Sequence, residues 1–260
     1  MEPETEIAQI FASEAEKAVI RLPKNLLQAL NQAEENSQGL EKKVFSRIIE
    51  NSFQAEKGKI PVCQDTGVFE VWLSVGKNSP LASLNLSYAA TQGIRAAHSS
   101  GLLRASMDDV RPIIHIEYND TDYVEVVVAA RGFGSENYTS LHMLPPGSGQ
   151  TRIIKEIVAA AEEAAARPCT PYLIGIGLGG TASKAVELSS KALTEIDFKP
   201  NDFEKKILDE VNGLGLGAGG FKGKYTALGV KVLKFPAHIA GLPLAVHLGC
   251  WANRYRKFRL

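Results

Sequence analysis

The sequence lacks an excess of charge, a long apolar run and a signal peptide. Lys and Arg together number 29, as do Asp and Glu, so the basic surplus typical of nucleic-acid binding is missing. No apolar stretch reaches the roughly 18 residues that a membrane-spanning helix needs. Residues 1–6 are acidic, with neither the basic nor the apolar region of a leader. We therefore expect a cytoplasmic protein that binds neither nucleic acid nor membranes.

Cysteine is also scarce. Cys63, Cys169 and Cys250 are an odd number, so they cannot all pair internally. In a reducing compartment such residues are buried apolar side chains, metal ligands or catalytic groups. Each follows or precedes a predicted core element at a loop, where a scaffold presents ligands. Three thiolates suit an iron–sulfur cluster with one iron lacking a protein ligand, although their wide spacing carries little specificity.

The loop around Cys63 brings several polar groups together. Cys63 is followed directly by the carboxamide of Gln64 and the carboxylate of Asp65, just ahead of the β-like run 68–75. An iron without a protein ligand can act as a Lewis acid on a substrate. We therefore expect Gln64 and Asp65 to lie at that iron. Zinc held by the three cysteines and His238 or His247 is an alternative, but no pair has finger-like spacing.

Secondary structure is predicted from the spacing of apolar residues. In residues 4–55 these recur three and four positions apart, which predicts helices interrupted at Pro23. Strands are expected at 68–75, 113–117, 123–130, 172–177, 227–234 and 242–248. Helices are expected at 86–98, 151–166, 182–193 and 202–214. Residues 119–122 predict a hairpin turn between two of the strands. The basic stretch 254–259 is expected to be a solvated end or a docking surface for another chain.

A glycine motif suggests a different class of function, dinucleotide binding. Gly175, Gly177 and Gly180 match the dinucleotide-binding fingerprint after a predicted strand, and Asp197 lies near the distance expected for a ribose ligand. However, Asp197 occupies a polar stretch that ends in proline, and no second strand is predicted there. The helix that begins after these glycines could instead bind an anionic group, such as a substrate carboxylate, through its first amides.

Histidine and arginine supply the remaining candidates. His98, His115 and His142 fit structural roles, whereas His238 is the best candidate for an active-site role. A small dicarboxylate is best bound by the planar, bidentate guanidinium group. Arg104 and Arg131 lie at loop edges and could serve this purpose, or could form ordinary surface ion pairs.

Four motifs carry a resemblance to a known family. They are the stretches 61–67, 134–137, 169–181 and 236–254, which include the three cysteines and the Gly134-Ser135-Glu136-Asn137 sequence. In this order they resemble the iron–sulfur-dependent class I fumarases and the related L-tartrate dehydratases, in particular the α subunit of the two-subunit form. The resemblance covers most of the chain from residue 57 onward. It implies an α/β fold with mixed sheets and packed helices, in one domain over 1–260. Residues 1–56 would be a helical segment, and 57–260 a core whose loops hold the cluster.

The resemblance also implies a site and an activity. Cys63, Cys169 and Cys250 would hold a 4Fe-4S cluster with one iron open to substrate. Gln64, Asp65, Arg104 and Gly134 would bind substrate, with Asp65 as the catalytic proton donor to the leaving hydroxyl. The expected reaction is reversible hydration of fumarate to L-malate, or alternatively dehydration of L-tartrate to oxaloacetate.

The resemblance implies partners as well. In this family the catalytic base lies on a further domain or on a β subunit, and the sequence ends at Leu260 before any such domain. We therefore expect a β subunit, together with pairing of α subunits into an α2β2 assembly. Two departures from the family pattern stand out. Thr170 replaces a common proline, and the glycine-rich stretch 218–225 contains Phe221 and Lys222.

Overall fold

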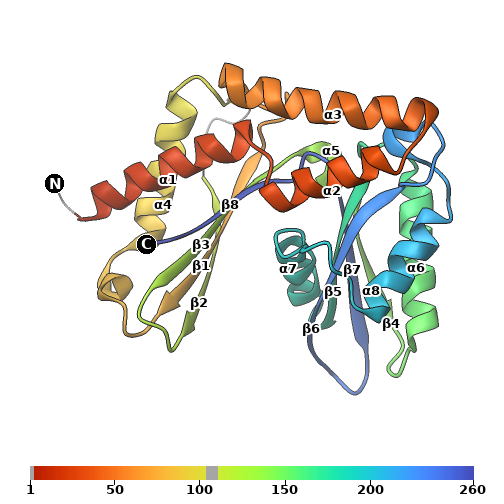
Figure 1. The fold of residues 1–260 in the computed structure, drawn as a ribbon. Helices are drawn as coiled ribbons and strands as arrows, with labels where there is room; N and C mark the ends of the chain where they lie inside the picture. Colours follow the sequence, from red (N-terminus) through yellow and green to blue (C-terminus); the bar gives the residue numbers. More distant parts are fainter. Residues whose placement is uncertain (1–2, 104–110) are drawn as a thin grey trace. The chain divides into compact units, whose positions relative to one another are not determined.

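The computed structural model describes residues 3–103 and 111–260 (Figure 1). The chain divides into two compact units, each with one four-stranded sheet. Unit 1 comprises Met1–Pro23, Asn51–Gly132 and Arg254–Leu260, and unit 2 comprises Lys24–Glu50 and Phe133–Asn253. Helix α3 (Gly39–Gly58) begins in unit 2 and ends in unit 1. The expected α/β fold with mixed sheets and packed helices is confirmed, while the single domain over 1–260 stays a prediction.

Unit 1 packs helices on one face of a sheet with the strand order β2-β1-β3-β8. Its strands are β1 (Val68–Gly76), β2 (Ile113–Asn119), β3 (Val124–Arg131) and β8 (Arg254–Arg259). Its helices include α1 (Pro3–Ile20), η1 (Pro80–Ser83) and α4 (Leu86–Ser99). Alternate residues of a strand point to one face, so Phe69, Val71 and Leu73 pack together against Phe11 of α1 and Ile94 of α4.

The predicted hairpin between β2 and β3 is wrong. β1 lies between them, parallel to β2 and antiparallel to β3. Five residues of β1, from Phe69 to Leu73, are buried in succession, which suits a central strand, whereas β2 is largely exposed and forms an edge. The connection after β2 instead closes the end of β1, where Gly76 N donates to Tyr123 O and Lys77 N to Asn119 O, both at 2.9 Å.

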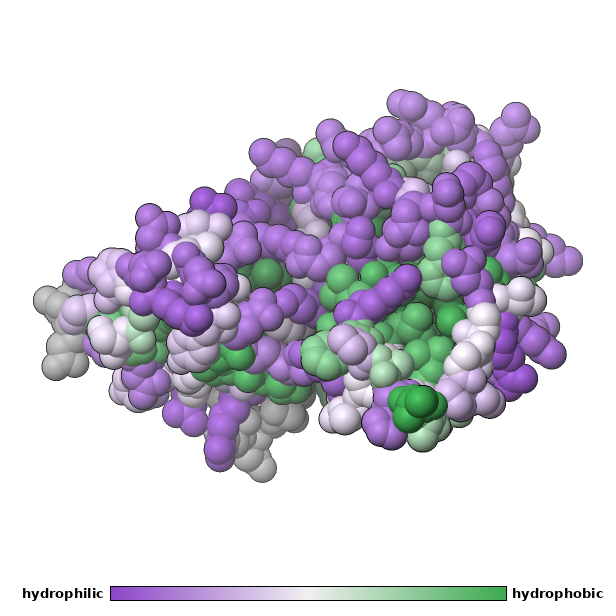
Figure 2. All heavy atoms as spheres, turned by 90° about the horizontal axis from the view of Figure 1, so that it is seen from below, coloured by the Kyte–Doolittle hydropathy of each residue, from purple (hydrophilic) through white to green (hydrophobic). Residues whose placement is uncertain are grey.

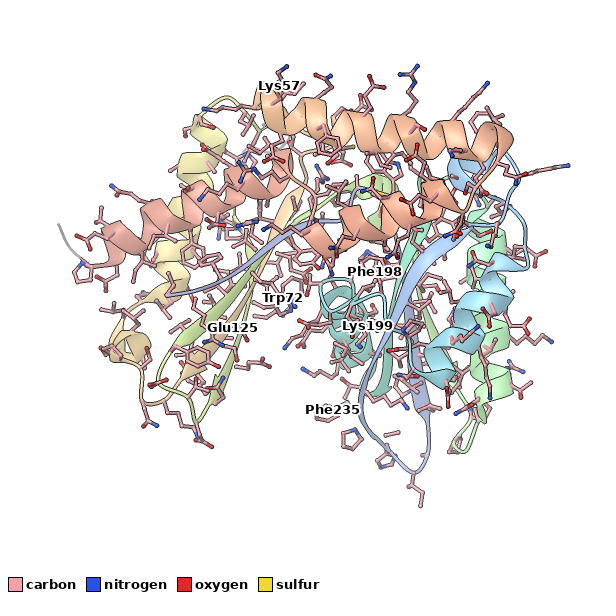
Figure 3. All side chains as sticks on the ribbon, viewed as in Figure 1. Lys57, Trp72, Glu125, Phe198, Lys199 and Phe235 are labelled. Carbon is pink, nitrogen blue, oxygen red and sulfur yellow. The ribbon has the colours of Figure 1, made fainter. Side chains whose placement is uncertain are left out.

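The second face of this sheet carries polar and aromatic side chains. Trp72 of β1 is buried with Val127, Ala129 and Tyr255. Trp72 and Glu125 are labelled in Figure 3, and the β1–β3 register puts them on the same face. Glu70 lies on that face too, because it is two residues from Trp72 on the same strand.

Unit 2 is a sheet in the order β4-β7-β5-β6 with helices on both faces. Its strands are β4 (Thr139–Leu144), β5 (Tyr172–Gly180), β6 (Ala227–Ala237) and β7 (Leu242–Gly249). Its helices are α2 (Lys24–Glu35), α5 (Phe133–Glu136), α6 (Gln150–Ala164), α7 (Ala182–Ala192), α8 (Asp202–Asn212) and η2 (Ala218–Gly220). Ile174 and Ile176 face the core with α6 and α8, while Gly175 and Gly177 face α7. Figure 1 shows these helices on either side of the sheet.

Most predicted elements are confirmed, but two strands, one short α-helix and the two 3-10 helices were missed. The helices of residues 4–55 appear as α1, α2 and the greater part of α3, with the interruption at Pro23. β4, the short α5 and β8 were not predicted. β8 corrects the expectation of a solvated end, because Arg254 and Tyr255 are buried in a strand that pairs with β3. Among the described residues, no helix is both long and apolar enough to cross a membrane.

Candidate functional site

The loop that carries Cys63 is fixed at both ends within unit 1. At its start, Val62 N donates to Val19 O and Asn51 Nδ2 donates to Val62 O, both at 2.9 Å. At its end, Gly67 has φ +84°, and a Cβ there would lie 2.2 Å from Arg131 O. Only glycine fits such a close approach of two backbones. The short segment between these anchors holds Cys63, which is half-buried, together with Gln64 and Asp65.

Asp65 lies over the backbone of Gly132. A Cβ on Gly132 would lie 3.0 Å from Asp65 Oδ2 and 3.4 Å from Arg254 Nη2. Arg254 is 2% exposed and begins β8. The carboxylate of Asp65 and the guanidinium of Arg254 therefore approach one point of the main chain, and the absence of a side chain at Gly132 leaves room for them.

A buried ion pair lies beside this loop. Glu70 accepts from Arg131 Nε and contacts His115 Nε2, both at 3.0 Å. The Arg131 guanidinium lies 5.4 Å from the centroid of the Trp72 ring, on which His115 stacks. Arg131 is therefore engaged in an ion pair, but a buried one and not the surface pair that the sequence offered as its alternative role. His115 has the structural role expected of it.

In unit 2, Cys169 and Cys250 are neighbours. Cys169 precedes β5, Cys250 follows β7, and these strands pair antiparallel with Leu173 opposite Gly249. Trp251 N donates to Cys169 O at 3.4 Å, and Cys250 N donates to Ser135 Oγ at 3.1 Å. The sheet thus brings together two thiols that are far apart in the sequence. Cys169 is exposed and Cys250 is half-buried, and neither forms a disulfide.

The chain beside Cys169 is tied to the glycine-rich loop 217–223. Thr170 Oγ1 donates to Gly217 O at 2.7 Å and accepts from Gly220 N at 3.1 Å. Thr170 is 1% exposed, so its buried hydroxyl organises the neighbouring loop.

A carboxylate from α3 stabilises the other side of the same loop. Glu41 is 6% exposed and accepts from Tyr225 N at 2.9 Å and from Lys224 N at 3.1 Å. Ala218 N is 3.4 Å from the same carboxylate. Backbone N–H groups that converge on a carboxylate satisfy a buried charge. Glu41, far away in the sequence, gave no signal of this role.

The glycines of β5 have a packing function. A Cβ on Gly175 would lie 2.1 Å from Ser189 O, and one on Gly177 would lie 1.9 Å from Ala185 O. They allow α7 to approach the sheet closely. A second parallel strand does exist, as β6, but it follows only after α8, so Asp197 lies between two helices. This geometry explains the glycine motif without a dinucleotide.

The remaining candidates are dispersed. Gly134 is exposed on α5, while Arg104 lies outside the described residues. His238 is exposed in the connection between β6 and β7, where its Nδ1 accepts from Ala240 N at 3.1 Å. His247 is 2% exposed, with Nε2 3.2 Å from Glu136 Oε1. Within each unit, the described residues contain no group of three His, Cys, Asp or Glu side chains placed to hold a metal ion.

Exposed apolar side chains lie where β6 ends and leads into β7 in unit 2. Ile239 is 88% exposed and Phe235 50% exposed. Ile239 lies in the connection between β6 and β7, and Phe235, labelled in Figure 3, lies near the end of β6. Figure 2, which views the molecule from below, shows apolar residues in green on the same part of the chain. This end of unit 2 therefore presents more apolar surface than its hydrophilic surroundings.

The sequence is similar to a family model and to several known proteins. A protein-family model described as fumarate hydratase (Fumerase) matches residues 8–259. The chain is 32% identical to a Methanocaldococcus jannaschii protein provisionally named L(+)-tartrate dehydratase subunit alpha, with 95% of each chain covered. It is 25% identical to the L(+)-tartrate dehydratase subunit alpha of Escherichia coli K12, over 95% of this chain and 88% of that one.

A third relative is longer. The chain is 29% identical to a Geobacillus stearothermophilus protein provisionally named class I fumarate hydratase. The match covers 90% of this chain but 51% of the relative. About half of that protein therefore has no counterpart in the present sequence.

Proposed function

The chain belongs to the fumarate hydratase family, and from this membership we propose that it is the α subunit of an iron–sulfur hydro-lyase that interconverts fumarate and L-malate. The observation that carries the proposal is the Cys63 loop. It is anchored at both ends and holds a carboxamide and a carboxylate directly beside a thiol. These are the groups that elimination of water from a hydroxy acid needs: a metal ligand, a hydrogen-bond donor and an acid.

The donor set fits a 4Fe-4S cluster. Cys63, Cys169 and Cys250 lie on loops and form no disulfide, and the last two are neighbours in unit 2. Thiolates are the soft ligands that iron–sulfur clusters require. Cys63, Cys169 and Cys250 would hold the cluster. When bound, it would supply Lewis acidity at one iron without a protein ligand.

The chain's own residues would then supply binding and proton transfer. The amide of Gln64 orients the substrate, and the backbone of Gly134 together with Arg104 binds its carboxylates. Asp65 donates a proton to the hydroxyl, which departs as water while the carbon–carbon double bond forms. A base on the partner subunit accepts the proton from the adjacent carbon.

A β subunit is the proposed source of that base. Two of the three relatives are named as alpha subunits, and the third is about twice as long as the present chain's match to it. We propose an α2β2 assembly located in the cytoplasm. The exposed apolar side chains at the connection between β6 and β7, including Ile239, provide surface that a partner could cover.

L-tartrate dehydration is a second candidate, favoured by the names of the two alpha-subunit relatives. Tartrate and malate share two carboxylates and a hydroxyl, so the residues proposed above serve both. The contacts that distinguish them would come in part from the partner subunit.

The test is anaerobic co-production with the partner subunit, followed by assays with fumarate, L-malate and L-tartrate. A brown protein that turns over at least one of them is expected. Replacement Asp65→Asn should keep the colour and lower kcat by about 10²- to 10⁴-fold, the usual contribution of general acid–base catalysis. A reconstituted complex inactive on all three substrates would refute the proposed function.

A further inference from the structure

Arg254 combines deep burial with a position next to the proposed acid. It is 2% exposed and opens β8, where it pairs with Ala130 of β3. A buried guanidinium is costly unless a carboxylate or several hydrogen bonds compensate its charge. A buried arginine is therefore expected beside an anionic group, and the neighbouring acids indicate which one.

Two carboxylates lie near the end of β3, and they differ in their partners. Glu70 is bound by Arg131 and His115. Asp65 Oδ2 lies 3.0 Å from the position of a Cβ on Gly132, and Arg254 Nη2 lies 3.4 Å from the same position. Each arginine of this region thus lies beside a different carboxylate: Arg131 beside Glu70, and Arg254 beside Asp65, the proposed proton donor.

Gly132 makes this approach possible. Gly67 rests on the backbone of Arg131, and Asp65 rests on that of Gly132, so the loop follows the end of β3 over two consecutive residues. The first atom of a side chain at residue 132 would lie 3.0 Å from the Asp65 carboxylate and 3.4 Å from the Arg254 guanidinium. Glycine at this position leaves both groups the space that a Cβ would crowd.

We propose that Arg254 is a positioning residue for Asp65. Its guanidinium holds the carboxyl group over Gly132 in one orientation, and Gly132 is the contact point that permits this orientation. Arg254 itself does not contact the substrate. The inference rests on the proposed function for the role of Asp65, but the arrangement of Asp65, Gly132 and Arg254 is a property of unit 1 alone.

The primary test is a double-mutant cycle in the holoenzyme. Arg254→Gln should lower kcat by about 10- to 100-fold with little change in KM, because small displacements of a catalytic group have effects of that size. Arg254→Lys should restore part of the activity. In an Asp65→Asn background, Arg254→Gln should have no further effect, since residues that act through one another are non-additive. Full additivity of the two replacements would overturn the proposal.

Gly132→Ala tests the same arrangement without removing a buried charge. It should lower kcat by about tenfold, because the new methyl group displaces the Asp65 carboxylate. Gly149→Ala is the matched control, since a Cβ at Gly149 meets nothing within 4 Å and Gly149 lies at the start of α6. Equal activity of the Gly132→Ala and Gly149→Ala enzymes would contradict the role of Gly132.

A structural readout separates this inference from the proposed function. Crystal structures of the full α chain, wild type and Arg254→Gln, should show the Asp65 carboxylate over Gly132 only in the wild type. An unchanged Asp65 orientation would overturn the inference even in an active enzyme. Conversely, a wild-type complex without hydro-lyase activity would refute the function and leave this comparison intact.

Discussion

In unit 2, Cys169 and Cys250 meet because they flank neighbouring strands of one sheet, whereas in unit 1 Cys63 depends on the anchors of a single loop. The β5–β7 register sets the first arrangement through many main-chain hydrogen bonds. The contacts of the second include an asparagine side chain, a main-chain hydrogen bond and close approaches at Gly67 and Gly132. The cysteine pair of unit 2 should therefore tolerate side-chain changes that displace the loop of unit 1.

The energetic consequence is a division of roles. A sheet register resists local change because a slip of one residue would move every buried side chain of the strand to the opposite face of the sheet. A loop seated on glycines can be shifted by one methyl group. Unit 2 is suited to hold ligands rigidly, and unit 1 is suited to place a carboxylate within a narrow tolerance.

The largest effect should come from removal of a thiol. Cys63→Ser, Cys169→Ser and Cys250→Ser are each expected to give a colourless complex without turnover, because serine is a poor ligand for iron–sulfur clusters. Thr170→Val is the matched control beside Cys169, since it loses the hydrogen bonds to Gly217 and Gly220 but keeps the thiol. Visible absorption and iron content after anaerobic reconstitution provide the measurement. A brown, active Cys169→Ser enzyme would exclude Cys169 as a ligand.

Next in size is the comparison of two glycines, one in each unit. Gly177→Ala should destabilise unit 2 by about 1–3 kcal/mol through overpacking against α7. Gly67→Ala should also destabilise unit 1, and in addition should lower kcat, because the Asp65 loop must move away from Arg131. Turnover per intact cluster measures the difference. Equal loss of turnover in both variants would remove the distinction between the units.

The two tryptophans allow the stability of each unit to be followed separately. Trp72 lies in unit 1 and Trp251 in unit 2, and the chain has no others. Denaturant unfolding of Trp72→Phe and Trp251→Phe proteins thus reports one unit at a time by fluorescence. A single shared transition in both proteins would show that the units unfold together.

The sequence predicted most helices and strands because their apolar spacing reflects local burial. It failed where pairing is decided by distant segments. The turn residues 119–122 are typical of a hairpin, yet the buried β1 occupies the central position between β2 and β3. β8 was missed because its charged residues do not give the apolar pattern of a strand, and its strand conformation is stabilised by pairing with β3.

The candidate site shows the same limit. The Cys63 loop could be recognised because Gln64 and Asp65 are adjacent in the sequence. No local pattern predicts the proximity of Cys169 and Cys250, which only the family resemblance implied, because it follows from the order and register of β5 and β7. Arg254 and Gly132 reach Asp65 through the pairing of β8 with β3, which no local pattern indicates.

A smaller effect is expected from Glu41, which supports the loop next to Cys169. Glu41→Gln should destabilise unit 2 by about 1–3 kcal/mol, since it weakens charge-assisted hydrogen bonds to buried N–H groups. Glu50→Gln on the same helix is the control, because its pair with Arg47 is exposed and should contribute little. Urea unfolding followed by Trp251 fluorescence in the Trp72→Phe protein compares the two. Equal midpoints would show that Glu41 does not support the loop.

The smallest effect is a pH dependence confined to unit 1. Burial lowers the pKa of His98, whose ring contacts Phe69 edge-on. Below about pH 6.5, the ordinary pKa of histidine, the unfolded chain binds a proton that folded His98 resists, so stability should fall as pH drops through this range. Above about pH 6.5, His98 is neutral in both the folded and the unfolded chain, so it causes no loss of stability. Urea midpoints from Trp72 fluorescence, in the Trp251→Phe protein at pH 7.5 and 5.5, test this. His98→Phe should reduce the dependence, while replacement of exposed His238 by Gln should leave it unchanged. Equal pH dependence with and without His98 would assign the effect to another group.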